Sequence, residues 1–219
     1  MAEQLILKSL PFIRILPTWA QELAYKYCSK TANLYIVHGN IRDFLPHKMN
    51  DNEFNFVKIQ NYIAEVLFGN RDIIAFYDRS SGVSFCNPEM RKEYLAAMGG
   101  SNGHPAEPLS RDPLEAFPAW ERFCYRNVAS KRRIVLIIDY AETILPNTDI
   151  SRFTDEDRYC LVTVNRWAND PIFTEGDISI ILLTENLADL NSKVVRSPAT
   201  IKVNIPLPDE TVRQRFLAF

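Results

Sequence analysis

The sequence predicts an α/β domain whose doubly wound, mostly parallel five-stranded sheet carries helices on both faces. Five short apolar runs alternate with segments whose apolar residues recur at helical spacing, which is typical of this class. Two of the runs, residues 134–138 and 178–183, are apolar almost throughout. A run without polar alternation indicates a strand buried on both faces, as parallel strands are between two layers of helices.

The first half of the chain is predicted to alternate helix and strand. Trp19, Leu23 and Tyr27 are spaced four residues apart and predict a helix, which begins after Pro17. Helical spacing recurs over residues 54–68 and predicts a second helix, which Gly69 stops. The short apolar runs 34–37 and 73–77 predict the first two strands.

A loop is predicted over residues 99–113, which hold three of the seven glycines and three of the thirteen prolines. The second half of the chain then continues the alternation of helices and strands. Its predicted elements are helix 117–128, strand 134–138, helix 157–168, strand 178–183, strand 200–205 and a helix that begins at residue 208.

Composition limits the function classes. The 219 residues are 47% hydrophobic and 24% charged, with a formal net charge of −2, which is typical of a soluble globular protein and argues against nucleic acid as a partner. No apolar run reaches the roughly 20 residues of a membrane helix or the about 7–15 of a signal peptide, so we expect a cytoplasmic protein without membrane contact. The four cysteines form no CxxC pair, which favours reduced thiols.

Polar residues follow two of the predicted strands. Asp139 comes directly after strand 134–138, which is the Walker B arrangement that aims a carboxylate at Mg²⁺. Asn186 follows strand 178–183, where a polar side chain can orient an attacking water. Both residues also have a structural interpretation, Asp139 as a helix cap and Asn186 as a turn residue. Because sites in such sheets lie at the carboxyl ends of the strands, both are candidate site residues.

Residues 178–217 resemble the second half of an AAA+ ATPase core, and with the Walker-B-like strand the resemblance covers roughly residues 130–219. In that family a strand ends in a sensor asparagine, a short helix ends in an arginine, and a fifth strand leads into the first helix of a lid domain. The matching positions are Asn186, Arg196, strand 201–205, the turn Pro206-Leu207-Pro208-Asp209, and Arg213 with Arg215. The resemblance implies that Arg196 is an arginine finger, which acts in trans on the nucleotide of the next subunit in a ring. The alternative is an ordinary surface arginine near a helix end.

The chain departs from the family at both parts that hydrolysis needs. The family's phosphate loop, G-x-x-x-x-G-K-[ST], would follow the first strand, where this chain has the residues 38–43, HGNIRD. None of the seven glycines precedes a lysine. Tyr140 stands where the family has a glutamate after Asp139, and the nearest glutamate is Glu142. Each loss would raise the barrier to hydrolysis by several kcal/mol.

The resemblance implies three parts of the chain: a helical N-terminal extension over residues 1–30, an AAA+-like α/β core over residues 31–207, and the start of a truncated lid helix over residues 208–219. It also implies ring assembly with an AAA+ module of the same or another chain.

These features predict a degenerate AAA+ module, resembling the N-terminal module of a tandem AAA protein, with an architectural or regulatory role in a larger ATP-dependent remodelling ATPase or ring. It would present Arg196 or an interface to an active module without hydrolysing ATP. Two alternatives stay open. One is a nucleotide-binding ATPase in which residues 38–43 form an atypical phosphate loop, with His38, Gly39 and Asn40 as its binding residues, and Asp139 binds the Mg²⁺ of ATP. The other is a pure protein-interaction module on the same scaffold.

Overall fold

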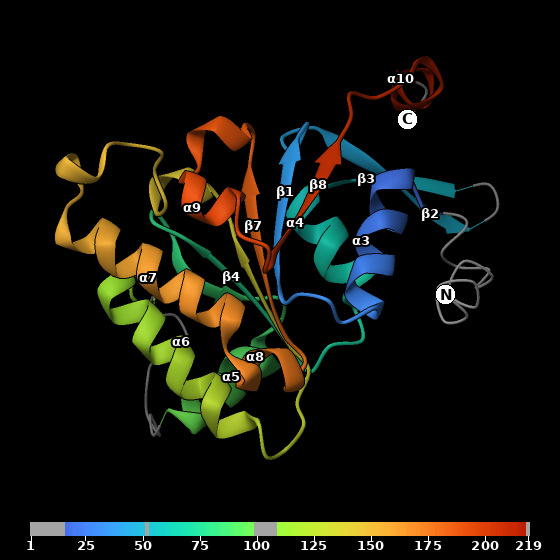
Figure 1. The fold of residues 1–219 in the computed structure, drawn as a ribbon. Coiled ribbons are helices and arrows are strands. Elements are labelled where there is room, and N and C mark those ends of the chain that lie inside the picture. The colour runs from blue at the N-terminus through green and yellow to red at the C-terminus, as the bar shows by residue number, and fades with distance from the viewer. Residues whose placement is uncertain (1–15, 51–52, 99–108, 218–219) are drawn as a thin grey trace.

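The computed structural model describes residues 16–50, 53–98 and 109–217 and contains a six-stranded sheet between two layers of helices (Figure 1). The strand order is β5-β4-β6-β7-β1-β8. Neighbouring strands are parallel except for β5, which pairs with β4 in an antiparallel hairpin at one edge. The strands are β1 (Leu34–Gly39), β4 (Ile73–Asp78), β5 (Gly82–Phe85), β6 (Ile134–Ile138), β7 (Ile178–Thr184) and β8 (Thr200–Ile205).

The central strands explain why the sheet needs helices on both faces. Every residue of β6 and of β7 is buried. Their sequences, IVLII and ISIILLT, are rich in β-branched side chains, which pack well on a pleated surface. A strand that is apolar toward both faces is stable only when helices cover both of them.

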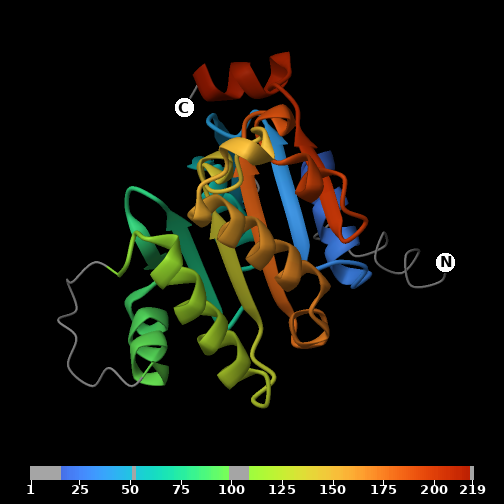
Figure 2. The ribbon, with the colours of Figure 1, turned by 60° about the vertical axis from the view of Figure 1, so that its left-hand side comes forward.

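The two faces of the sheet carry different helices (Figures 1 and 2). One face packs against α3 and a helix that α4 begins and the π-helical segment η1 continues. The other face packs chiefly against α6 and α7, whose Trp120 and Trp167 are fully buried. The helices and helical turns are α3 (Thr18–Cys28), α4 (Ile59–Asn61), η1 (Tyr62–Leu67), α5 (Pro88–Ala97), α6 (Pro113–Asn127), η2 (Ala141–Thr143), η3 (Ile150–Arg152), α7 (Asp155–Asn169), α8 (Pro171–Glu175), η4 (Leu187–Asp189), α9 (Ser192–Val195) and α10 (Glu210–Leu217).

The predicted fold class is confirmed, since all five predicted strands are present and parallel in one sheet. The sixth strand, β5, was not predicted because it is a four-residue edge strand of which two residues are buried. The helix α5 was also not predicted. Tyr94 is its one buried residue, while Met90 and Leu95 are only partly buried against the core, so its apolar stripe is short.

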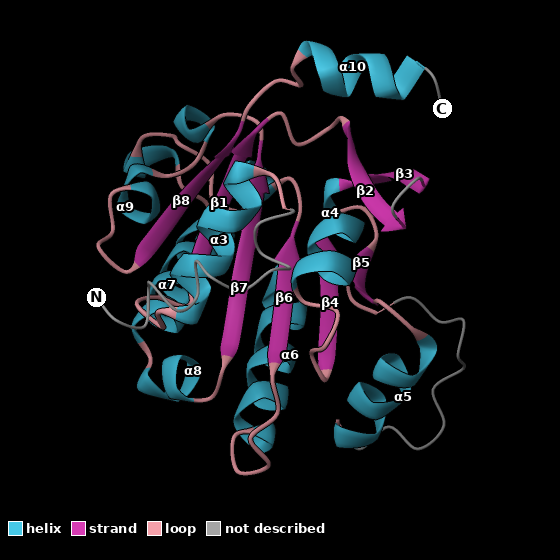
Figure 3. Cartoon of the chain, turned by 90° about the vertical axis from the view of Figure 1, so that its right-hand side faces the viewer, coloured by secondary structure: helices cyan, strands magenta, loops and turns pink. Residues whose placement is uncertain are grey.

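A second, two-stranded sheet corrects the prediction of a helix over residues 54–68 (Figure 3). There β2 (Phe44–Asn50) and β3 (Glu53–Lys58) form an antiparallel hairpin, and helical structure begins only at Ile59. Apolar residues at positions 54, 56 and 57 fit a strand as well as a helix. The pairing with β2, which the local pattern does not reveal, decides between them.

Two of the predicted segments lie partly outside the described residues. Residues 99–108 of the predicted loop lie outside them, and α6 begins at Pro113, where Asp112 caps it by accepting from the Leu114 N–H. Residues 1–15 of the predicted N-terminal extension also lie outside them, while its remainder forms α3, which packs on the sheet. Within the described ranges, no helix combines the length and apolar character that crossing a membrane requires.

Candidate functional site

Side chains from three loops and one helix meet at the carboxyl edge of the sheet. The loops follow β1, β6 and β7, which are neighbours in the order β6-β7-β1. Arg42 comes from the first loop, Asp139 and Tyr140 from the second, and Glu185 from the third, while Gln60 projects from α4. We call these five residues the Arg42 cluster. Its location is the crevice in which open α/β sheets place their ligands.

Asp139 is the buried centre of the Arg42 cluster, with 8% of its side chain exposed. Its Oδ1 accepts hydrogen bonds from Arg42 Nη1 at 2.8 Å and from the Tyr140 backbone N–H at 2.8 Å. Its Oδ2 accepts from Arg42 Nη1 at 2.9 Å and from Gln60 Nε2 at 2.5 Å. Each oxygen therefore has two donors, which offset the several kcal/mol that desolvating a carboxylate costs.

Arg42 connects two acids and an aromatic ring. Besides Asp139, its Nε donates to Glu185 Oε1 at 3.0 Å, and its Cζ lies 3.9 Å from the centre of the Tyr140 ring. Although burial lowers the pKa of the Arg42 guanidinium, the hydrogen bond to Glu185 and the charge of Asp139 together raise that pKa above its ordinary value. A fixed, planar cation thus fills the space in front of Asp139.

Tyr140 has a strained backbone, with φ 51° and ψ 46° in the left-handed region. For a residue with a side chain this costs about 1–2 kcal/mol, and such strain is concentrated at functional or tightly determined sites. Its ring is about half exposed and stacks on the Arg42 guanidinium, which contributes roughly 0.5–2 kcal/mol in return.

The loop after β1 does not have the geometry of a phosphate-binding loop. Such a loop leaves successive backbone N–H groups free to point at an anion. Here the N–H of Gly39 donates to Glu185 O at 3.1 Å, that of Asn40 to Ile205 O at 2.9 Å, and that of Ile41 to Gly39 O at 2.8 Å. The amides at the end of β1 therefore bind the protein's own carbonyl groups.

The element after this loop also differs from a phosphate site. A phosphate loop leads directly into a helix whose N-terminus carries partial positive charge. Here the hairpin of β2 and β3 is inserted, and the helix begins at Ile59. The Gln60 side chain in its first turn donates to Asp139, so that the helix binds the protein's own carboxylate.

One known protein family matches most of the chain. The family described as AAA+ chaperone, N-terminal Rossmann-like domain, matches residues 10–206. The chain belongs to this family. Among solved structures, a chain of the E. coli MS115-1 HORMA:CdnC:Trip13 complex is similar, with a TM-score of 0.52 and 16% identity, over 99% of this chain and 65% of that one. At this identity the similarity shows the fold alone. A search of curated proteins returned no match.

Three other candidate residues of a nucleotide site lie at the carboxyl ends of β1 and β7. Asn186 is exposed, and its Oδ1 accepts from the Ala188 N–H at 3.1 Å, so it caps η4. His38 is half-buried near the end of β1, where burial and the charge of Lys202 lower its pKa and favour the neutral ring. Asn40 donates through Nδ2 to the Asp43 carboxylate at 2.7 Å.

Arg196 follows α9 as its C-cap and is exposed. Its backbone N–H donates to Ser192 O at 2.9 Å. Over the ranges that the structure describes, its side chain forms neither a hydrogen bond nor an ion pair. An exposed guanidinium of this kind is available to another molecule.

The residues present do not fit Mg²⁺-ATP in this arrangement. Both oxygens of Asp139, the candidate Mg²⁺ ligand, are taken by Arg42, and the candidate loop residues Gly39 and Asn40 have bonded amides. Within the described part of the chain, no group of three or more His, Cys, Asp or Glu side chains is arranged to hold a metal ion. The chemistry that the Arg42 cluster can perform by itself is electrostatic: it neutralises a buried acid.

Sequence reasoning found Asp139 but missed three members of the Arg42 cluster. Arg42 lies in the stretch that was considered as an atypical phosphate loop, yet its partner is 97 residues away. Gln60 was assigned to the interior of a helix that in fact starts beside it. Glu185 was passed over for its neighbour Asn186. One signal in the sequence could have indicated the pair. Arg42 comes just after the first predicted strand and Asp139 just after the third, and the carboxyl ends of parallel strands meet at one edge of the sheet.

Proposed function

We propose that this AAA+ chaperone-type domain is a non-hydrolysing module with an architectural or regulatory role in a larger ATP-dependent remodelling ATPase or ring. The observation that carries the proposal is the ion pair between Arg42 and Asp139. It puts the protein's own cation where a Walker B aspartate would meet Mg²⁺. The lack of a GK sequence and the presence of Tyr140 support it.

The partners of such a module are other proteins. The similar chain of known structure comes from a complex named for HORMA, CdnC and Trip13, and this chain spans 65% of its length. By this analogy we propose that the domain works beside an active AAA+ module of the same or another chain, without nucleic acid or membrane as a partner.

Titration of the domain with Mg²⁺-ATP tests the proposal. We expect no saturable heat, which corresponds to a dissociation constant weaker than about 1 mM, and no release of phosphate. The matched comparison is Asp139→Ala, which should change neither result. Saturable binding with turnover that Asp139→Ala abolishes would overturn the proposal and favour the ATPase with an atypical phosphate loop.

We further propose that Arg196 acts in trans on a neighbouring active module. Its exposed side chain, which has no partner in the described part of the chain, supports this role. When the native assembly is purified through this chain, Arg196→Ala is expected to lower its ATP turnover. Lys193→Ala, an exposed change in the same helix, should leave turnover unchanged. Equal turnover in both variants would refute the role of Arg196 and favour a pure protein-interaction module.

A further inference from the structure

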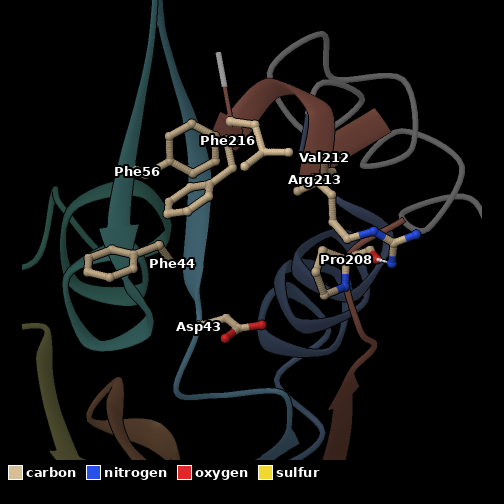
Figure 4. A pocket seen from close by; sticks show the side chains of 8 residues that line it. Asp43, Phe44, Phe56, Pro208, Val212, Arg213 and Phe216 are labelled. Atoms are coloured by element: carbon tan, nitrogen blue, oxygen red, sulfur yellow. Dashed lines mark hydrogen bonds between the residues drawn. The ribbon is translucent and has the colours of Figure 1, made fainter. Parts of the chain in front are cut away.

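An aromatic face of the β2–β3 hairpin lies opposite the helix α10 at the carboxyl edge of the sheet (Figures 3 and 4). The hairpin contributes Phe44 and Phe56, and α10 contributes Phe216. The ring centroids of Phe56 and Phe216 are 5.0 Å apart with the rings edge to face. Those of Phe44 and Phe216 are 6.3 Å apart with an interplanar angle of 21°. Both geometries are in the range of favourable aromatic pairs.

These aromatic rings border a mostly apolar cavity of about 350 Å³ between the hairpin and α10. In Figure 4 the side chains of Phe44, Phe56 and Phe216 gather on one side of it, while Arg213 lies near Pro208. The residues that line it are Asp43, Phe44, Phe56, Pro208, Val212, Arg213, Phe216 and Leu217. Because Val212 and Phe216 are four residues apart, they lie on one face of α10 and both reach the cavity.

The hairpin is a firm support for such a contact. Leu45 is buried and belongs to the same apolar core as Ile59 and Tyr62. The ring of His47 lies edge to face against Tyr62, with 6.2 Å between the centroids. The hairpin therefore joins the core on one side and presents aromatic rings to α10 on the other.

The helix α10, by contrast, has little packing of its own. None of its residues is buried, and Leu217 is 85% exposed. Arg213 Nη1 donates to Pro208 O at 2.8 Å, which secures the start of the helix but does not attach it to the core. An eight-residue helix is marginal in water without tertiary contacts, so its position depends on the hairpin contact.

From these contacts we infer that the aromatic face of the hairpin, Phe44 and Phe56, is a docking surface for an amphipathic helix, and that its occupant is α10 of the same chain. The hairpin follows residues 38–43, which stand where the family has its phosphate loop. It thus holds the helix that follows the core by an apolar contact that needs no nucleotide. The independence from nucleotide rests on the proposed function, whereas the docking contact stands on the ring geometry alone.

Hydrogen exchange of the backbone amides of α10 in the full chain tests the inference. Phe216→Ala is expected to speed exchange of these amides about tenfold, because the ring contacts are lost while alanine favours a helix more than phenylalanine does. Phe44→Ala, which leaves α10 unchanged in sequence, should act in the same direction. Thr211→Ala, an exposed change within α10, should not speed exchange.

The outcomes separate the two proposals. Equal exchange in the parent and in both phenylalanine variants would overturn the docking contact, whatever the result of the ATP titration. Slower exchange of α10 on addition of Mg²⁺-ATP would overturn its independence from nucleotide. If ATP binds in the titration while α10 still depends on Phe44 and Phe216, the proposed function fails and the docking surface stands.

Discussion

Replacing Arg42 with alanine is expected to lower the free energy of unfolding by about 2–3 kcal/mol. The change leaves Asp139 buried without its cation, with two hydrogen bonds from Gln60 and the Tyr140 N–H. Breaking a fully buried ion pair costs roughly 3–5 kcal/mol, and we expect less here because 31% of the Arg42 side chain is exposed. Urea denaturation of parent and variant measures the difference.

Three further variants make the Arg42 result specific. Arg79→Ala removes an arginine from the more exposed ion pair with Glu156 and should cost less than about 1 kcal/mol. Arg42→Lys keeps the charge without the planar fork and should fall between parent and Arg42→Ala. Asp139→Asn in the Arg42→Ala background removes the stranded charge and should restore part of the stability. An Arg42→Ala variant as stable as the parent would show that the ion pair contributes nothing to the fold.

The Arg42 cluster also shows which part of a site can be predicted from sequence. Asp139 was predictable because its position follows from the strand before it, a local apolar pattern that ends in one acid. Its state was not predictable, because the three donors that make its four hydrogen bonds come from three segments of the chain. A sequence motif indicates where a carboxylate lies, but only the tertiary structure shows which donors bind it.

The fold was predictable where the pattern of apolar residues within one segment indicates which of its side chains are buried. Strands β6, β7 and β8 were predicted nearly to the residue because each is apolar or alternates regularly. The β2–β3 hairpin was not, because its stability depends on pairing between two amphipathic segments. The hairpin that follows the loop after β1 was for this reason not foreseen.

A second large effect is expected at Gly39, where β1 enters the loop that carries Arg42. Its φ is +95°, which a residue with a side chain adopts only under strain. A Cβ here would lie 2.6 Å from Ile205 O and 2.7 Å from Asn204 Oδ1. Gly39→Ala is therefore expected to lower the free energy of unfolding by about 2–4 kcal/mol, measured by the same denaturation.

The two close contacts of a Cβ at position 39 can be separated. Asn204 can move its side chain, whereas Ile205 O belongs to the backbone of β8 and accepts from the Asn40 N–H. Adding Asn204→Ala to Gly39→Ala should thus restore only part of the loss. If Gly39 served mainly to admit a phosphate group, the parent would bind Mg²⁺-ATP and Gly39→Ala would weaken that binding. A large loss of stability, with no change in the binding of Mg²⁺-ATP, instead assigns the glycine to the contact between β1 and β8.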